Sequence, residues 1–95
     1  MYKRQDATTL AAVAAEIPTA AWPGGGPHAA VAIAVASGAA SSNGEARRLI
    51  AQGGLTVNGR AVREPDATYG DDDLLAGRYL LVRRGKRDYR MLVRT

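Results

Sequence analysis

The spacing of apolar residues predicts an amphipathic helix over residues 43–52, followed directly by a hairpin. Ala46, Leu49 and Ile50 recur at the i, i+3 and i+4 positions, which lie on one face of a helix. The other positions of this stretch are mostly small, polar or charged. The pattern therefore predicts a short helix that buries one face and exposes charge on the other.

Both ends of this helix carry signals. Ser42 and Glu45 fit a capping box, in which the serine accepts from an amide of the first turn and the glutamate reaches back. The glycine pair 53–54 is typical of a helix end, because glycine adopts the left-handed conformation without a Cβ clash. Residues 55–57 then alternate like a half-buried strand, and the Asn-Gly pair 58–59 predicts a type I′ hairpin turn.

Two more helices are predicted upstream. Residues 6–17 follow the helical period and end before Pro18. Residues 19–27 are rich in glycine and proline and predict a loop, in which Trp22 is the one residue able to anchor the loop to a core. Residues 28–36 predict a second helix of alanine and valine.

The helix over residues 28–36 follows a proline, and His28 is expected at its start. Val31 and Val35 share a face of this helix. Since only a short turn separates it from the helix over 43–52, the two helices should be neighbours, with the valines facing the apolar side of the second helix.

The C-terminal half predicts a small sheet. Residues 63–76 form a polar loop that contains an aspartate run at 71–73. Residues 78–84 and 88–94 read as strands around a turn at 85–87, with successive side chains pointing to opposite faces. The fold class is therefore α+β, with two packed helices followed by a small antiparallel sheet.

The predicted organisation has three parts. Residues 1–5, MYKRQ, resemble the translation of a common sequencing adapter, which would make the gene model a contig fragment with native sequence from about Asp6. Residues 6–27 form a lead-in helix and a Gly/Pro linker. Residues 28–95 form the domain.

The net charge of +4 is unevenly distributed. Residues 47–63 carry only basic charges, residues 64–77 only acidic ones, and residues 78–95 are again basic with Asp88 as the single acid. If the fold brings the two basic segments together, they form a face that attracts a polyanion. The alternative is a solvated arginine-rich surface without a partner.

The start of the basic helix is a candidate phosphate site made by Ser42, Asn43, Arg47 and Arg48. Guanidinium groups bind phosphate oxygens in a bidentate fashion, and a helix N-terminus adds amide donors and a favourable dipole. The alternative is that Glu45 and the acidic loop pair with these arginines.

The turn between the last two strands carries the second basic cluster, Arg83, Arg84, Lys86 and Arg87, with Arg90 nearby. Like charges at this density repel one another, which favours an anionic partner. Two tyrosines of these strands, Tyr79 and Tyr89, are either base-stacking residues or core residues with a hydrated hydroxyl.

The sequence lacks the sets of residues that most catalytic sites and metal sites require. There is no cysteine and only one histidine, so disulfides, thiolate metal sites and Ser–His–Asp triads are not supported. The aspartate run lacks the alternate ligand spacing of an EF-hand loop, and the glycine run 24–26 lacks the phosphate-loop context. No catalytic residue and no metal site is predicted for this chain. The N-terminus of the given sequence lacks the sustained hydrophobic region typical of a signal peptide, and the apolar run at residues 29–40 is too short to span a bilayer.

The stretch SNGEARRLIAQGGLTVNG resembles the S4 RNA-binding motif, a small-residue helix cap and basic helix followed by GG-x-V-x-NG. GEARRLIAQGG, VNGRAV and DDLLAGRYLLVRRGKRDY together are similar to the C-terminal S4-like domain of bacterial tyrosyl-tRNA synthetases, and LAAVAAEIPTA resembles the segment before it. The resemblance extends from about Thr8 onward. RYLLVRRGKRDY is the discriminating part, because generic S4 modules do not require it.

The resemblance implies an S4-like (αL motif) domain that binds tRNA(Tyr) near the anticodon stem and the long variable arm. It also implies a missing catalytic domain that uses ATP, with no cofactor in this fragment, and a homodimeric parent in the cytoplasm. Where the family commonly has Lys or Arg, this chain has Asn43. The expected RNA-binding residues are Ser42, Asn43, Arg47, Arg48, Asn58, Arg60, Arg83, Arg84, Lys86 and Arg87.

Two alternatives stay open. One is a free-standing S4 protein, or the S4 domain of an RNA-modifying enzyme, that binds ribosomal RNA. The other is a structural module that contacts the catalytic domain or a partner subunit and binds no RNA.

Overall fold

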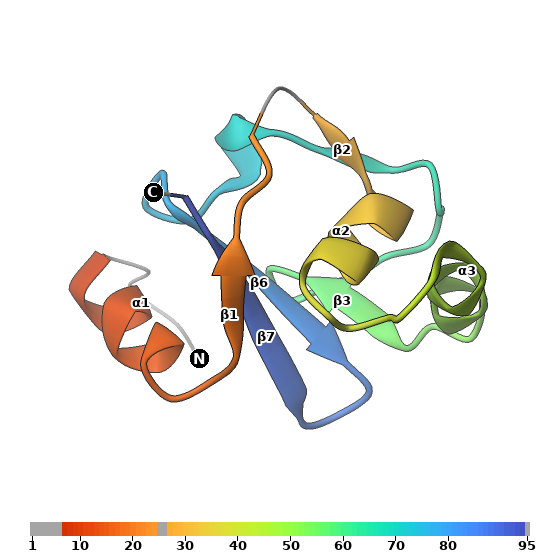
Figure 1. Ribbon diagram of the computed structural model, residues 1–95, viewed down its shortest axis with the longest axis horizontal. Coiled ribbons are helices and arrows are strands. Elements are labelled where there is room, and N and C mark those ends of the chain that lie inside the picture. The colour runs from red at the N-terminus through yellow and green to blue at the C-terminus, as the bar shows by residue number, and fades with distance from the viewer. Residues whose placement is uncertain (1–6, 25–26, 95) are drawn as a thin grey trace.

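The computed structural model describes residues 7–24 and 27–94, and the predicted adapter segment 1–5 lies outside them. The α+β fold is confirmed (Figure 1). The elements are α1 (Ala7–Ala14), β1 (Thr19–Ala21), β2 (His28–Ala29), α2 (Ala30–Ala36), α3 (Asn43–Ala51), β3 (Leu55–Val57), β4 (Arg60–Ala61), β5 (Thr68–Tyr69), the 3-10 turn η1 (Asp71–Asp73), β6 (Tyr79–Arg84) and β7 (Asp88–Val93).

The main sheet has the strand order β1-β7-β6-β3-β4. Its centre is the predicted antiparallel pair β6–β7, which runs in register from Tyr79 opposite Val93 to Arg84 opposite Asp88. β3 continues the sheet antiparallel to β6, and the β3–β4 hairpin turns at Asn58 and Gly59. Both turn residues have positive φ, 51° and 83°, as the type I′ prediction requires.

The other edge of the sheet differs from the prediction. Residues 19–21, expected in a loop, form β1, which pairs parallel with β7 and makes the sheet mixed. The Met91 amide donates to the Pro18 carbonyl at 3.0 Å, and the Trp22 amide to the Val93 carbonyl at 2.9 Å. The residues Thr-Ala-Ala show no strand pattern of their own. They form a strand because the edge of β7 offers unpaired backbone groups to which they can hydrogen-bond.

Trp22 anchors the segment that follows β1, as predicted. Its side chain is 8% exposed and belongs to the main core. Its Nε1 donates to Asp71 Oδ1 at 3.0 Å, and its ring meets His28 edge-on with the ring centroids 5.4 Å apart. Trp22 is therefore packed into the core, and its indole is hydrogen-bonded to η1.

The β6–β7 ribbon buries both of its faces. Leu80, Val82 and Leu92 lie in the core that α2 and α3 cover. Tyr79 and Met91 lie in a second, smaller core with Ala14 and Ile17 at the end of α1. Figure 1 shows α1 on one side of the ribbon and α2 and α3 on the other. The predicted alternation of side chains is therefore confirmed.

The buried face of α2 is not the predicted one. Val31 is buried, but Val35 is 37% exposed, whereas Ile33 and Ala34 are fully buried. All side chains of this helix are small or aliphatic, so the spacing of the valines did not determine which face would pack. The face of α2 that carries Ala30, Ile33 and Ala34 packs into the main core.

The prediction that His28 starts a helix was wrong. His28 and Ala29 form β2, which pairs antiparallel with β5, Thr68–Tyr69, inside the segment predicted as one polar loop. The His28 side chain bonds to the Gly24 carbonyl. The pairing joins segments about 40 residues apart, which local patterns do not reveal.

The end signals of α3 are confirmed with one difference. Ser42 Oγ accepts from the Glu45 amide at 3.1 Å, whereas the Glu45 carboxylate reaches the amide of Ser41, one residue before the expected partner. At the other end Gly53, with φ 72°, and Gly54 donate to the carbonyls of Ile50 and Leu49. This is the Schellman arrangement.

Within residues 7–24 and 27–94, no helix has the length and apolar character needed to cross a membrane.

Candidate nucleic-acid interface

The exposed side of α3 presents the two adjacent arginines of the predicted phosphate site. Arg47 and Arg48 are exposed, while Ala46, Leu49 and Ile50 face the core. Among the described residues, no carboxylate oxygen lies within 4.0 Å of either guanidinium group. Neither arginine is therefore ion-paired with Glu45 or with the acidic loop, although Arg48 lines one small pocket with Glu45.

The start of α3 is less open to an anion than the sequence suggests. The Ser42 hydroxyl is engaged with the Glu45 amide, and Glu45 Oε1 accepts from the Ser41 amide at 2.6 Å and from its hydroxyl at 3.2 Å. The bond from the Ser41 amide lowers the pKa of Glu45, so this carboxylate is ionised at neutral pH. Asn43 is exposed beside it. This negative charge disfavours an anion at the start of the helix.

Arg84 joins α3 from the end of β6. Its Nη1 donates to the Ala39 carbonyl at 2.9 Å and lies 3.8 Å from Glu45 Oε1. Arg84, Arg48 and Glu45 line one small pocket of about 130 Å³. The fold therefore brings Arg48 and Arg84, which come from the two predicted basic segments, together beside α3. We call these two residues, with the exposed Arg47 of the same helix and with Arg90, the α3 basic surface.

Arg90 belongs to this surface although it is not among the expected contacts. It lies opposite Val82 in the β6–β7 register, and its Nη1 is 2.9 Å from the point where a Cβ on Gly38 would lie. Its Nε is 3.3 Å from Asp88 Oδ1. Strand alternation was the signal that could have identified it, because residues 90 and 92 point to the same side of β7 and Leu92 is buried.

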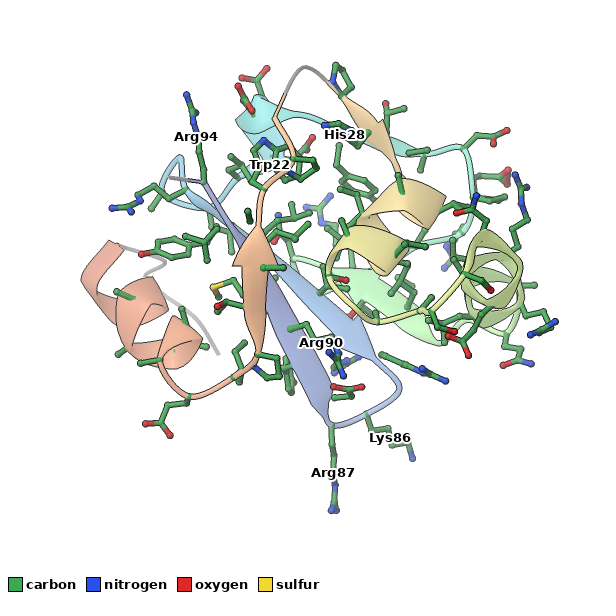
Figure 2. The ribbon with its side chains drawn as sticks, viewed as in Figure 1. Trp22, His28, Lys86, Arg87, Arg90 and Arg94 are labelled. Carbon is green, nitrogen blue, oxygen red and sulfur yellow. The ribbon has the colours of Figure 1, made fainter. Side chains whose placement is uncertain are left out.

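Arg83 points away from the α3 basic surface although it neighbours Arg84. It lies opposite Tyr89, and its guanidinium carbon is 5.9 Å from the centre of that ring. Lys86 and Arg87 lie in the turn, and Figure 2 shows both side chains extending away from the body of the molecule. The predicted basic cluster is thus divided over two faces and a tip.

Asn58 and Arg60 lie elsewhere. Asn58 Nδ2 donates to the Asp73 carbonyl at 2.7 Å, and Asn58 Oδ1 accepts from the Leu81 amide at 3.0 Å. Arg60 lines a pocket together with Asp72 and Asp73. The geometry gives Asn58 a role in joining the hairpin to η1 and β6.

We expect Asn58→Ala to lower the free energy of unfolding by about 1–3 kcal/mol, because the variant leaves the Leu81 amide without its acceptor. Urea denaturation of both proteins measures this. The RNA affinity of the folded variant should equal that of the wild type. Lost RNA affinity with unchanged stability would instead make Asn58 an RNA contact.

The aspartate run serves local structure. Asp73 Oδ2 accepts from the Gly70 amide at 2.8 Å, and Asp71 accepts from Trp22 and lies 3.9 Å from Arg94. Burial, and to a smaller extent the Asp73 charge, raises the pKa of Tyr69. None of the three aspartates lies within 4.0 Å of an arginine of the α3 basic surface, whereas Arg94 and Arg60 lie beside Asp71 and beside Asp72 and Asp73.

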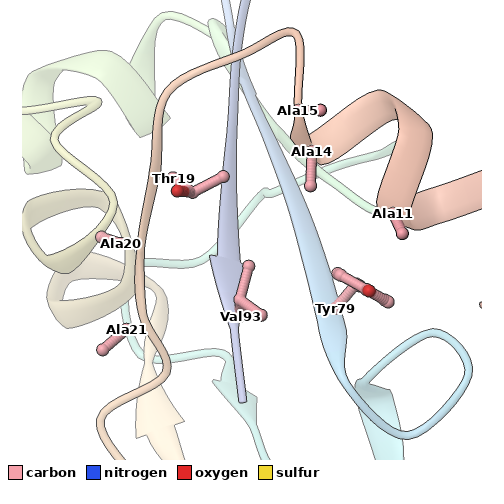
Figure 3. A pocket seen from close by; sticks show the side chains of 8 residues that line it. All are labelled: Ala11, Ala14, Ala15, Thr19, Ala20, Ala21, Tyr79 and Val93. Carbon is pink, nitrogen blue, oxygen red and sulfur yellow. The ribbon is translucent and has the colours of Figure 1, made fainter. Parts of the chain in front are cut away.

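One apolar groove, of about 550 Å³, lies between α1 and the sheet (Figure 3). Five alanines line it together with Thr19, Tyr79 and Val93. None of the described residues that line it carries a charge, so these residues offer nothing that would bind a phosphate.

The family model and the relatives that match this chain all belong to tyrosine–tRNA ligases. The family model described as the tyrosine–tRNA ligase SYY-like C-terminal domain matches residues 9–92. A tyrosine–tRNA ligase of Nocardia farcinica is 48% identical over 64 residues, which is 67% of this chain and 15% of the relative. The ligase of Mycobacterium bovis is 43% identical over 84 residues, 88% of this chain and 20% of the relative. The chain thus spans at most about a fifth of the length of these relatives.

Proposed function

The chain belongs to the family of tyrosine–tRNA ligase SYY-like C-terminal domains, and we propose that it is the part of such a ligase that docks tRNA(Tyr). The α3 basic surface carries the proposal. Arg47 and Arg48 face outward without an ion pair among the described residues, and Arg84 and Arg90 extend the same surface from the sheet. Arginines in such an array suit a row of phosphates.

The docking is electrostatic and depends on RNA shape. Phosphate contacts position the RNA, and a folded RNA is distinguished by the spacing of its backbones more than by its paired bases. The acidic region around η1 repels the RNA backbone, so the charge separation would orient the domain. In the proposal, the contacted groups are the anticodon stem and the long variable arm.

The remaining activity belongs to other parts of the proposed parent protein. That protein would attach tyrosine to tRNA(Tyr) with ATP bound in a catalytic domain outside this chain. We further propose that it is a homodimer and acts in the cytoplasm. This chain would contribute affinity and orientation, and no catalytic residue.

Filter-binding titrations of the 95-residue chain test the proposal. Transcribed tyrosine tRNA with its long variable arm should bind tighter than a tRNA with a short variable arm, and log K should fall linearly with log salt concentration. Equal affinity for the two RNAs would overturn docking on the variable arm. The absence of salt-dependent RNA binding would overturn RNA binding altogether and favour a structural module.

A further inference from the structure

The face of the β6–β7 ribbon opposite the α3 basic surface ends in an exposed aromatic side chain. Tyr89 is 38% exposed, whereas Tyr79 on the same face is 5% exposed and lies in the smaller core. Tyr89 belongs to neither core cluster of the described residues. Of the two tyrosines that the sequence offered for stacking, only Tyr89 has an accessible ring.

The surroundings of Tyr89 are cationic. The Arg83 guanidinium lies over its ring at 5.9 Å, within the range of a cation–π contact. Arg83 Nε is buried and has no hydrogen-bond partner among the described residues. Arg87 lies in the adjoining turn, where the Tyr89 amide donates to its carbonyl at 3.1 Å, and its side chain extends into solvent (Figure 2).

We propose that Tyr89 and Arg83 form a stacking site for one unpaired nucleotide of the bound RNA, its phosphate facing the cations of the turn. A nucleotide combines a flat base with an adjacent negative charge, and the site combines an exposed ring with neighbouring cations. An apolar peptide would match the ring but not the charges. The inference rests on the proposed RNA binding and adds a second contact face to it.

The two faces of the ribbon then have different tasks. Arg84 and Arg90 lie on the face with α3 and bind phosphates, while Tyr89 and Arg83 lie on the opposite face and hold a base. The RNA would pass around the tip formed by Lys86 and Arg87. Fully paired RNA offers no free base to the second face, so this face responds only to RNA with unpaired nucleotides.

The test compares Tyr89→Leu and Tyr89→Phe in titrations of the 95-residue chain with transcribed tyrosine tRNA and with a blunt, fully paired RNA duplex. Tyr89→Leu should lose about tenfold in affinity for the tRNA, since it removes the ring. Tyr89→Phe keeps the ring and should stay within about twofold of the wild type. Neither variant should change affinity for the duplex or the salt slope, because no phosphate contact is removed.

Thermal unfolding by circular dichroism checks that both variants fold. Unchanged tRNA affinity of Tyr89→Leu overturns the inference and leaves the proposed function standing. Equal losses on the tRNA and the duplex, or a loss in Tyr89→Phe as large as in Tyr89→Leu, also overturn it. If the wild-type chain binds no RNA, both the inference and the proposed function fall.

Discussion

The double substitution Arg47→Glu/Arg48→Glu should reduce affinity for tyrosine tRNA by about a hundredfold or more. Hydrogen bonds to charged groups contribute about 1.5–3 kcal/mol each, so two lost phosphate contacts amount to about 3 kcal/mol or more. The plot of log association constant against log salt concentration should become shallower by about 2, which is one unit for each lost contact. Binding isotherms at several salt concentrations measure both effects.

These two arginines are better suited to this test than Arg84. Arg84 donates to the Ala39 carbonyl, so its replacement would also loosen the contact between β6 and the α2–α3 turn. Arg47 and Arg48 are exposed and form no ion pair within the described residues, so their replacement should preserve the fold.

The matched control is Arg78→Glu/Arg94→Glu, which changes the net charge by the same amount. These arginines lie at the opposite end of the β6–β7 ribbon from the turn, where the Arg94 amide donates to the Arg78 carbonyl. Circular dichroism first checks that the control folds, because Arg94 lies 3.9 Å from Asp71 and Arg78 lies over the Tyr79 ring. The folded control should keep most of the affinity and of the salt slope. If both double variants lose affinity equally, net charge alone drives binding and the α3 basic surface is not the docking site.

For stability, the largest expected effect is at Ile33. Ile33→Ala should lower the free energy of unfolding by about 2–5 kcal/mol, because the removed methyl groups leave a cavity between α2 and the sheet. Domains of this size are stable by about 5–15 kcal/mol in total, so the variant should be close to unfolding. Urea denaturation monitored by Trp22 fluorescence measures the change.

Val35→Ala is the matched control on the same helix. Val35 is 37% exposed, so its truncation should cost less than about 0.5 kcal/mol, and the higher helix propensity of alanine offsets part of that cost. A large loss at Val35 with a small one at Ile33 would mean that α2 packs through the face predicted from the valines.

The elements that the sequence predicted correctly are those whose cause is local. The cap at Ser42, the glycine end of α3 and the Asn58–Gly59 turn each depend on a few neighbouring residues, and all are present. The β6–β7 hairpin was equally clear, because two alternating segments flank a short turn. Local geometry of this kind follows from backbone sterics and side-chain periodicity.

The candidate site was predictable in its components but not in its arrangement. The sequence identified the basic residues, and strand alternation put Arg83 and Arg84 on opposite faces, yet it could not show which of the two faces α3 adjoins. It also gave no sign that the Asn58 amide is engaged with Asp73 and Leu81. Arg90 became part of the site only through its approach to Gly38.

The sequence by itself thus determined the α3 helix with its ends, the two hairpins, the separation of charges and the family resemblance. The tertiary structure alone decided that β1 joins the sheet, that α2 packs through Ile33, and that Arg48, Arg84 and Arg90 share one surface while Tyr89 lies on the other. The physical reason is that these features depend on contacts between segments distant in the chain. Their free energy comes from burial and strand pairing, which depend on the neighbours that the fold supplies.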